Sequence, residues 1–373
     1  MLNHLYTGYP KFSAAQFELP KDRFESVLTH ELLNRLFGKL HHAGVLRSRP
    51  DAVLSERFDR IVAKRMRPGG NLFVGWSNQS LRCLRTAREF GMTTILERGS
   101  SHIEWQRAVL LEERARTGLN GEIPDVRSVE RELQEYAAAD YIAVPSKFAA
   151  ATFREKGFPD DRLLVNPYGV NIQRFKVQRR QPESGLRVLH VGRISMQKGV
   201  QYLVSAVNKV PGANLTLVGT VDPGMNWLKK EQRVQLVGPV PGHDLPAFYA
   251  KADVFCLLSL QEGLALVLAQ AMASGLPVIA TPNTGVEELI EDKVQGFVIP
   301  PRDIDAAADR LQKLADNPAL RAEMGARAQA KVSNGFSWID YGIRARTIYQ
   351  SVLAVRGRSA DAETVAAVYD RRF

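Results

Sequence analysis

The chain has 373 residues, 45% hydrophobic and 24% charged, a composition that excludes a disordered chain and is long enough for two domains with separate cores. Its formal net charge of +10 favours an anionic partner such as a nucleotide, an acidic lipid or a nucleic acid. The two cysteines, Cys83 and Cys256, lack metal-ligand spacing and are too few for a disulfide framework. Because MLNHLYTGYP has no signal-peptide pattern, the sequence predicts a cytoplasmic protein.

A basic cluster near residue 60 is the first segment with a usable geometry. Its cations recur at helical spacing beside an apolar face, and they are Arg57, Arg60, Lys64 and Arg67. Such a helix is either a core helix with a solvated outer face or a surface for peripheral contact with an anionic membrane. Nucleic acid is not an expected partner, because no recognition motif is present and no aromatic residues alternate with the cations.

Strand-like apolar runs alternate with helix-like periodic segments along the chain. In the first half, NLFVGWS, TTILERG and YIAVPS are each followed by a helical pattern. In the second half the strand-like runs are LRVLHVGRI, NLTLVGT, RVQLVGPV and DVFCLLS. This alternation predicts an α/β fold of parallel sheets covered on both faces, and the length suits two such sheets.

The break between the sheets is expected at residues 168–185, where periodicity stops and charged, proline and glycine residues gather. We therefore predict a first domain over residues 1–175 and a second over 180–340, with helices over about 341–373 returning to the first. Ligands of open parallel sheets bind beyond the carboxyl ends of the strands, so two facing sheets predict a cleft. Site residues are expected in the turns that follow strands.

The turn HVGRISMQKG, residues 190–199, follows such a strand. Gly192 permits close approach of a ligand to the backbone, and Arg193 and Lys198 place positive charge just before the next helix. This combination suits a diphosphate. Taken alone, the segment is more simply interpreted as a turn with two solvated cations, because short patterns of this kind match by chance.

The stretch EGLALVLAQAMASGLPVIA follows the strand DVFCLL and predicts a helix from about Ala265 to Ser274, stopped by Gly275, and then a short strand. The N–H groups at the start of this helix suit an anion such as a phosphate. The Glu262 carboxylate would repel a diphosphate, so it is expected to contact a neutral, hydroxyl-rich group attached to that diphosphate. Phosphates beside hydroxyls describe a nucleotide sugar.

Several motifs together resemble the signatures of retaining glycosyltransferases of family four, which have the GT-B architecture of two facing Rossmann-like domains. The motifs are VNPYGVNIQRF, GRISMQKG and DVFCLLSLQEGLALVLAQAMASGLPVIATPNTGVEELI. The resemblance covers roughly residues 75–350 and is strongest in the second half. Several ordered motifs at compatible spacing are more specific than any single one.

The resemblance implies roles for individual residues. Arg193 and Lys198 match the cations that hold the donor diphosphate, and Glu262 matches the carboxylate that binds hydroxyls of the donor sugar. Gln270 stands where a second glutamate binds the ribose, and Val240 lies in the segment beside the base. The full set of implied donor-binding residues is Gly192, Val240, Gly263, Leu264, Ala265, Leu266 and Gln270.

His102 follows the strand TTILE and the residues RGSS, a place where this family often carries a histidine near the reacting centre. A lone histidine is more often structural. Its place at a strand end facing the cleft makes a functional role equally plausible, and the resemblance decides in favour of a catalytic role. Two features depart from the family pattern. Nothing before HLYTGYP supplies the usual first strand and glycine-rich loop, and Gln270 replaces a glutamate.

The resulting prediction is a retaining, metal-independent hexosyltransferase with no cofactor. It uses a nucleotide-diphosphate sugar of the UDP or GDP type and a glycan, lipid-linked or small-molecule acceptor, in cell-surface or exopolysaccharide synthesis. It is expected in the cytoplasm or peripherally at the inner face of the membrane. An inactive nucleotide-sugar-binding or scaffold protein, or a GT-B enzyme of another reaction type, stays open as an alternative.

Overall fold

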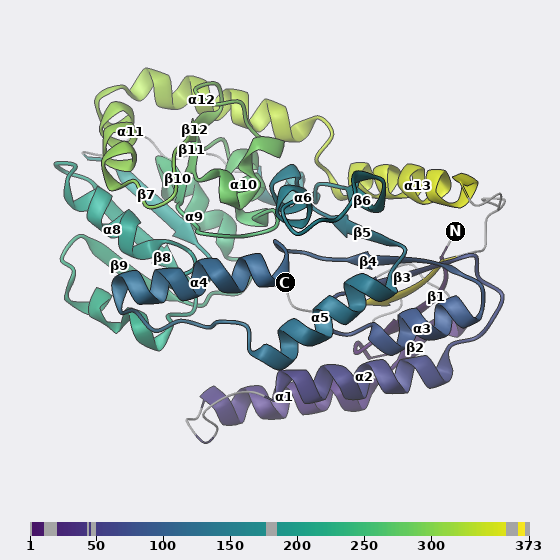
Figure 1. Cartoon of the computed structure of the whole chain (residues 1–373). Coiled ribbons are helices and arrows are strands. Elements are labelled where there is room, and N and C mark those ends of the chain that lie inside the picture. Colours follow the sequence, from purple (N-terminus) through teal and green to yellow (C-terminus); the bar gives the residue numbers. More distant parts are fainter. Residues whose placement is uncertain are drawn as a thin grey trace.

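The structure is a computed structural model that describes residues 2–10, 21–42, 45, 50–176, 185–355 and 365–369. Within these residues the chain forms a seven-stranded and a six-stranded sheet, and all paired strands run parallel (Figure 1). The strands are β1 Leu2–Thr7, β2 Phe24–Ser26, β3 Leu72–Trp76, β4 Thr93–Glu97, β5 Tyr141–Val144, β6 Leu163–Val165, β7 Arg187–Val191, β8 Asn214–Val218, β9 Val234–Gly238, β10 Val254–Leu257, β11 Val278–Ala280, β12 Gly296–Val298 and β13 Val365–Tyr369. The α-helices are α1 Leu28–His42, α2 Asp51–Arg65, α3 Leu81–Glu89, α4 Ile103–Thr117, α5 Val126–Ala138, α6 Lys147–Arg154, α7 Ile172–Phe175, α8 Val200–Asn208, α9 Leu245–Lys251, α10 Leu266–Ala273, α11 Ile304–Asp316, α12 Pro318–Ser333 and α13 Trp338–Val355.

The first sheet has the strand order β2-β1-β13-β3-β4-β5-β6, and the second has the order β12-β11-β10-β7-β8-β9. Both orders change direction at an internal strand, so loops at the carboxyl ends diverge there and leave space for a ligand. Every strand-like run named from the sequence forms a strand, which confirms the expected α/β fold of parallel sheets. Of the expected break at 168–185, residues 177–184 lie outside the described part of the chain.

The first sheet contains a strand that the sequence pattern did not predict. Residues 365–369 were expected to be helical but form β13, which pairs with β1 on one side and β3 on the other. Valine and tyrosine favour extended backbone, and pairing on both sides satisfies the N–H and C=O groups. The expectation of helices throughout about 341–373 is therefore wrong for this segment.

The expected lack of a first strand and glycine-rich loop concerns the start of the chain. Residues 2–7 form β1, which pairs with β2 and β13 within the first sheet. Residues 11–20, where a glycine-rich loop would follow, lie outside the described residues. The strand is therefore present, and the expectation about the loop stays a prediction.

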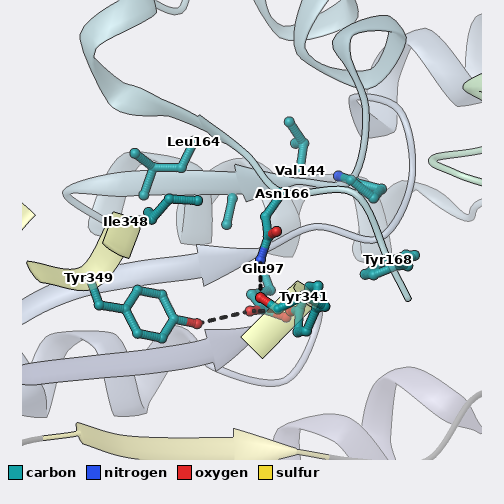
Figure 2. Close-up of a pocket in the computed structure, with 10 residues that line it drawn as sticks. Glu97, Val144, Leu164, Asn166, Tyr168, Tyr341, Ile348 and Tyr349 are labelled. Atoms are coloured by element: carbon teal, nitrogen blue, oxygen red, sulfur yellow. Dashed lines mark hydrogen bonds between the residues drawn. The ribbon is translucent and has the colours of Figure 1, made fainter. Parts of the chain in front are cut away.

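Helix α13 brings the chain back to the first sheet after the second sheet is complete (Figure 1). Its Tyr341 and Tyr349 hydroxyls each lie 3.3 Å from Oε1 of Glu97, the last residue of β4 (Figure 2). Burial raises the pKa of Glu97 above its ordinary value, although the two tyrosines oppose the shift. Val352 and Leu353 of the same helix belong to a hydrophobic cluster with residues of β3 and β4.

Helix α4 follows a strand of the first sheet but packs on helices of the second (Figure 1). The carboxylate of Glu113 is fully buried and accepts hydrogen bonds from Tyr202 Oη at 2.6 Å, Gln201 Nε2 at 2.8 Å and Arg302 Nε at 2.8 Å. Val109 packs against the core cluster of the second sheet. The helix therefore bridges the two sheets. No helix among the described residues has the length and apolar content needed to cross a bilayer.

Candidate active site

The turn after β7 places Arg193 and Lys198 at the carboxyl edge of the second sheet. Gly199, the residue before α8, has φ +66°, and a Cβ there would lie 1.9 Å from the carbonyl oxygen of Leu258. Only glycine fits, and its absence of a side chain lets the turn pack directly against the segment that follows β10. Strands β7 and β10 are neighbours in this sheet, so the two turns share one edge, as expected from the sequence.

Lys198 and Glu262, from the two neighbouring turns, form a direct ion pair. Their side chains are 19% and 13% exposed, so the pair sits in a recess and not on the open surface. The Glu262 N–H donates to the carbonyl oxygen of Asn283 at 2.8 Å, which fixes the loop that carries the carboxylate. The structure thus brings two residues named from the sequence into contact with one another.

Helix α10 begins beside this ion pair and has an open N-terminus. Ala265 is its N-cap residue, and no side chain caps the helix. The Ala265 N–H donates to Thr284 O at 3.1 Å, whereas no acceptor among the described residues pairs with the N–H groups of Gly263 and Leu264. Unpaired N–H groups and the positive end of the helix dipole make this position suitable for a phosphate.

Arg193 has two carboxylate partners. Its Nε lies 2.5 Å from Oδ1 of Asp222, and its Nη1 pairs with Glu122. Burial alone would lower the pKa of Arg193, but the bonds to Glu122 and Asp222 outweigh burial and raise it. The guanidinium is therefore a permanent cation at this edge of the sheet.

The loop after β4 contacts the loop after β10 directly. Ser100 Oγ and Ser101 Oγ each donate to Oε1 of Gln261 at 2.9 Å. A Cβ on Gly263 would lie 2.2 Å from the carbonyl oxygen of Gly99, so a larger residue at 263 would push the two loops apart. The first and second sheets therefore meet at the residues that the motifs single out.

His102 lies at the start of α4 and is 1% exposed. Its Nδ1 accepts the N–H of Glu104 at 3.3 Å, which caps the helix. Three aromatic rings pack around the imidazole, those of Tyr136, Phe153 and Phe158. Burial, followed by the positive charges of Lys156 and Arg98, lowers the pKa of His102 to about 4. The ring is thus a neutral helix cap, and its catalytic role stays a prediction.

His102 gives the protein a testable pH dependence. Its pKa is 6.5 ordinarily and about 4 in the folded chain, so only the unfolded chain gains a proton between these values. The neutral His102 imidazole makes its full contribution to the free energy of unfolding above the ordinary pKa. This contribution is lost as pH falls, and the free energy of unfolding decreases by up to about 3 kcal/mol. His102→Asn keeps a capping side chain that does not titrate, so its free energy of unfolding should fall less on acidification. Urea unfolding of both proteins at several pH values checks this, and parallel curves would contradict it.

Two further residues that the sequence assigned to donor binding, Gln270 and Val240, contact residues other than Lys198 and Glu262. Gln270 Oε1 accepts a hydrogen bond from Tyr249 Oη at 3.0 Å, and Tyr249 is fully buried. Val240 packs against the hydrophobic cluster that includes β10 and α10. Their assignments to the ribose and the base stay predictions.

A cavity of about 820 Å³ lies between the two sheets, next to Arg193. On the first-domain side it is lined by Asn78, Arg98 and Glu132, among others, and on the second-domain side by Arg193, Gln197 and Asp222. Arg98 and Glu132 pair at 3.2 Å. Carboxylates outnumber cations on the wall, because Asp51, Glu122, Asp125, Glu132 and Asp222 line it against Arg98 and Arg193. Carboxylates accept hydrogen bonds from hydroxyl groups and repel anions, so such a wall suits a neutral, hydroxyl-rich ligand better than an anionic one.

Sequence reasoning missed three residues that the structure brings to this region. Asp222 and Glu122 hold Arg193 but stand in segments without a recognisable motif. Gln261 is fully buried, and its Nε2 has no hydrogen-bond partner among the described residues. A buried polar group without a partner is uncommon and marks a position where a ligand or water can bind. Gln261 directly precedes Glu262 in the sequence, and this position was the only sequence feature that could have identified it as a site residue.

The arrangement of the two sheets and the cleft is that of the GT-B class. Anabaena HepE, solved in complex with UDP, matches with a TM-score of 0.65 at 17% identity, over 94% of this chain and 100% of that one. At this identity the likeness establishes the fold, two facing Rossmann-like domains, as expected from the sequence.

The second domain carries a match to a known family. Residues 171–331 match the family model described as "Glycosyl transferases group 1". The putative colanic acid biosynthesis glycosyltransferase WcaL of Salmonella typhimurium is 26% identical over 55% of each chain. The GDP-mannose-dependent phosphatidylinositol monomannoside mannosyltransferase of Mycobacterium tuberculosis is 29% identical over 58% of this chain and 62% of its own.

The chain spans roughly half the length of the first curated relatives it matches. The match of residues 171–331 to the model of group 1 glycosyl transferases confirms the resemblance that the motifs indicated.

Proposed function

We propose that the chain is a retaining glycosyltransferase that moves a hexose from a nucleoside-diphosphate sugar to an acceptor hydroxyl. The observation that carries the proposal is the convergence of Arg193, Lys198, Glu262 and the open N-terminus of α10 on the edge formed by β7 and β10. HepE, of the same fold, is described in complex with UDP, which supports a nucleotide-sugar donor.

The positive groups explain how the donor bond would break. Negative charge develops on the diphosphate as it leaves, and a fixed cation or N–H group aimed at that charge stabilises the transition state. Arg193 and Lys198 already hold carboxylates, which shows that anionic oxygens are stable at both positions. No metal is part of the proposal because these groups supply the needed charge. Retention is carried over from the family resemblance.

The acceptor would bind in the cavity beside Arg193. Its carboxylate-rich wall and its size of about 820 Å³ suit the hydroxyl groups of a glycan or of a lipid-linked saccharide. The names of the relatives, which refer to colanic acid and to phosphatidylinositol mannoside, support polysaccharide or glycolipid synthesis.

Peripheral contact with an anionic membrane is a further part of the proposal. Helix α1 exposes Leu28, Leu32 and Leu36, which recur every fourth residue on one face. Helix α2 packs on α1 and exposes Lys64, while Phe58 and Val62 on its opposite face are buried. Exposed leucines on one helix and an exposed cation on the helix packed against it favour an anionic lipid surface. Sedimentation with vesicles of anionic and of neutral lipid tests this contact.

Thermal stabilisation by a series of UDP and GDP sugars tests the proposed function. One or a few donors should raise the melting temperature, because ligand binding to the folded state stabilises it. The stabilising donor should then lose its nucleoside diphosphate in the presence of acceptor, with or without EDTA. If no nucleotide sugar stabilises the chain, the proposed function is wrong. Binding without turnover would favour the scaffold alternative.

A further inference from the structure

Arg193 has two carboxylate partners that differ in kind. Asp222 lies in the same domain as Arg193, and its side chain is 4% exposed. Its backbone N–H donates a hydrogen bond to Ile194 O at 3.0 Å, which fixes its position. Glu122 comes from the other side of the cleft and has a side chain that is 70% exposed. Asp222 is therefore a fixed partner that orients the guanidinium. The Glu122 carboxylate is already largely exposed to water, so its solvation changes little when it leaves Arg193.

Glu122 reaches Arg193 because the segment between α4 and α5 runs along the second domain. Helix α4 ends at Gly118 in a left-handed conformation, and α5 is capped by Asp125. Between them, a Cβ on Gly121 would lie 3.2 Å from Met196, and a Cβ on Gly224 would lie 2.1 Å from Asn120 O. These close approaches hold the segment 119–124 against the second domain at the edge of the cavity.

The proposed function requires a diphosphate at Arg193, and Glu122 already supplies an anion there. A carboxylate and a phosphate have the same sign of charge and compete for the same donor groups. We propose that Glu122 is a positioning residue that occupies the diphosphate site on Arg193 and must be displaced when donor binds. This inference rests on the proposed function and adds a residue that sets donor affinity and selectivity.

The consequence for selectivity follows from the geometry. A phosphate that takes the place of the Glu122 carboxylate at Nη1 of Arg193 must displace Glu122, and a ligand without phosphate groups need not. Replacing the carboxylate by an amide removes the competing charge while keeping the size of the side chain. Glu122→Gln should therefore strengthen the binding of nucleoside diphosphates and leave the binding of the corresponding nucleosides unchanged.

The experiment measures dissociation constants of UDP, GDP, uridine and guanosine by calorimetry for the wild-type chain and Glu122→Gln. We expect roughly two- to five-fold tighter binding of the preferred diphosphate, the range that corresponds to the loss of an exposed ion pair. The KM for the donor should fall by a similar factor, because uniform binding affects KM and not kcat. The nucleosides should not change.

Two controls make the result specific. Glu112→Gln removes another exposed carboxylate of this bridging region, which pairs with Arg302 at 3.0 Å. Neither Glu112 nor Arg302 lines the cavity, so this substitution should leave diphosphate binding unchanged. In an Arg193→Ala background, Glu122→Gln should have no effect, because the two residues then no longer interact.

Unchanged or weaker diphosphate binding by Glu122→Gln, with wild-type binding intact, would overturn the inference but leave the proposed function standing. If Glu122→Gln bound nucleosides and nucleoside diphosphates more tightly by the same factor, the inference would also be overturned, because Glu122 would then affect the shape of the site and not compete with phosphate. If neither protein binds any nucleotide, the proposed function fails and the inference fails with it.

Discussion

Arg193→Ala should lower donor turnover by about 100- to 1000-fold, the loss seen when one strong donor to a developing oxyanion is removed. The guanidinium is a permanent cation fixed by Asp222, so it needs no rearrangement when the leaving diphosphate gains charge. Arg193→Lys should restore part of the rate, because it keeps the charge but not the planar pair of N–H donors. Release of nucleoside diphosphate from the stabilising donor measures the effect.

The control for Arg193 separates catalysis from stability. The substitution leaves Asp222, which is 4% exposed, without its partner, so some loss of stability is also expected. Rates are therefore compared well below the melting temperature of each protein. Arg327→Ala, at an exposed ion pair on α12, is the matched control and should keep wild-type turnover. Near-normal turnover by Arg193→Ala would remove this residue from the mechanism.

Glu262→Gln should weaken binding of the nucleotide sugar relative to the free nucleoside diphosphate by roughly ten-fold or more, the range for a lost hydrogen bond to a charged group. The structure adds a reason to compare the two ligands. Because Glu262 pairs with Lys198, the substitution also frees the cation for phosphate, and that gain acts on both ligands. The ratio of the two dissociation constants therefore isolates the contact to the sugar.

The matched control for this test is Glu323→Gln, which removes an exposed carboxylate from α12 and should change neither dissociation constant. Equal effects of Glu262→Gln on both ligands would show that this carboxylate does not bind the sugar. It would then serve only to hold Lys198.

Local sequence patterns predicted the parts of the site that are formed by residues close together in the sequence. The runs around β7 and β10 were recognisable from apolar residues between turn residues, and Gly199 marked the close turn before α8. Adjacent parallel strands then brought Lys198 and Glu262 to one edge, and they form an ion pair. The helix predicted in the stretch EGLALVLAQAMASGLPVIA begins at Leu266, one residue from the expected start at Ala265.

Contacts between distant segments could not be predicted in this way. Strand β13 lies between β1 and β3, and its short apolar run gave no indication of these partners. Glu122 meets Arg193 only because α4 packs on the second domain through Glu113, and no local pattern encodes that packing. His102 was expected at the reacting centre, whereas its surroundings are set by aromatic residues far along the chain.

A crystal structure of the chain with the nucleoside diphosphate that stabilises it tests the central claim most directly. The account predicts phosphate oxygens within hydrogen-bond distance of Arg193, Lys198 and the N–H groups at the start of α10, with Glu122 displaced from Arg193. A diphosphate bound elsewhere, with the Glu122 and Glu262 ion pairs intact, would contradict it.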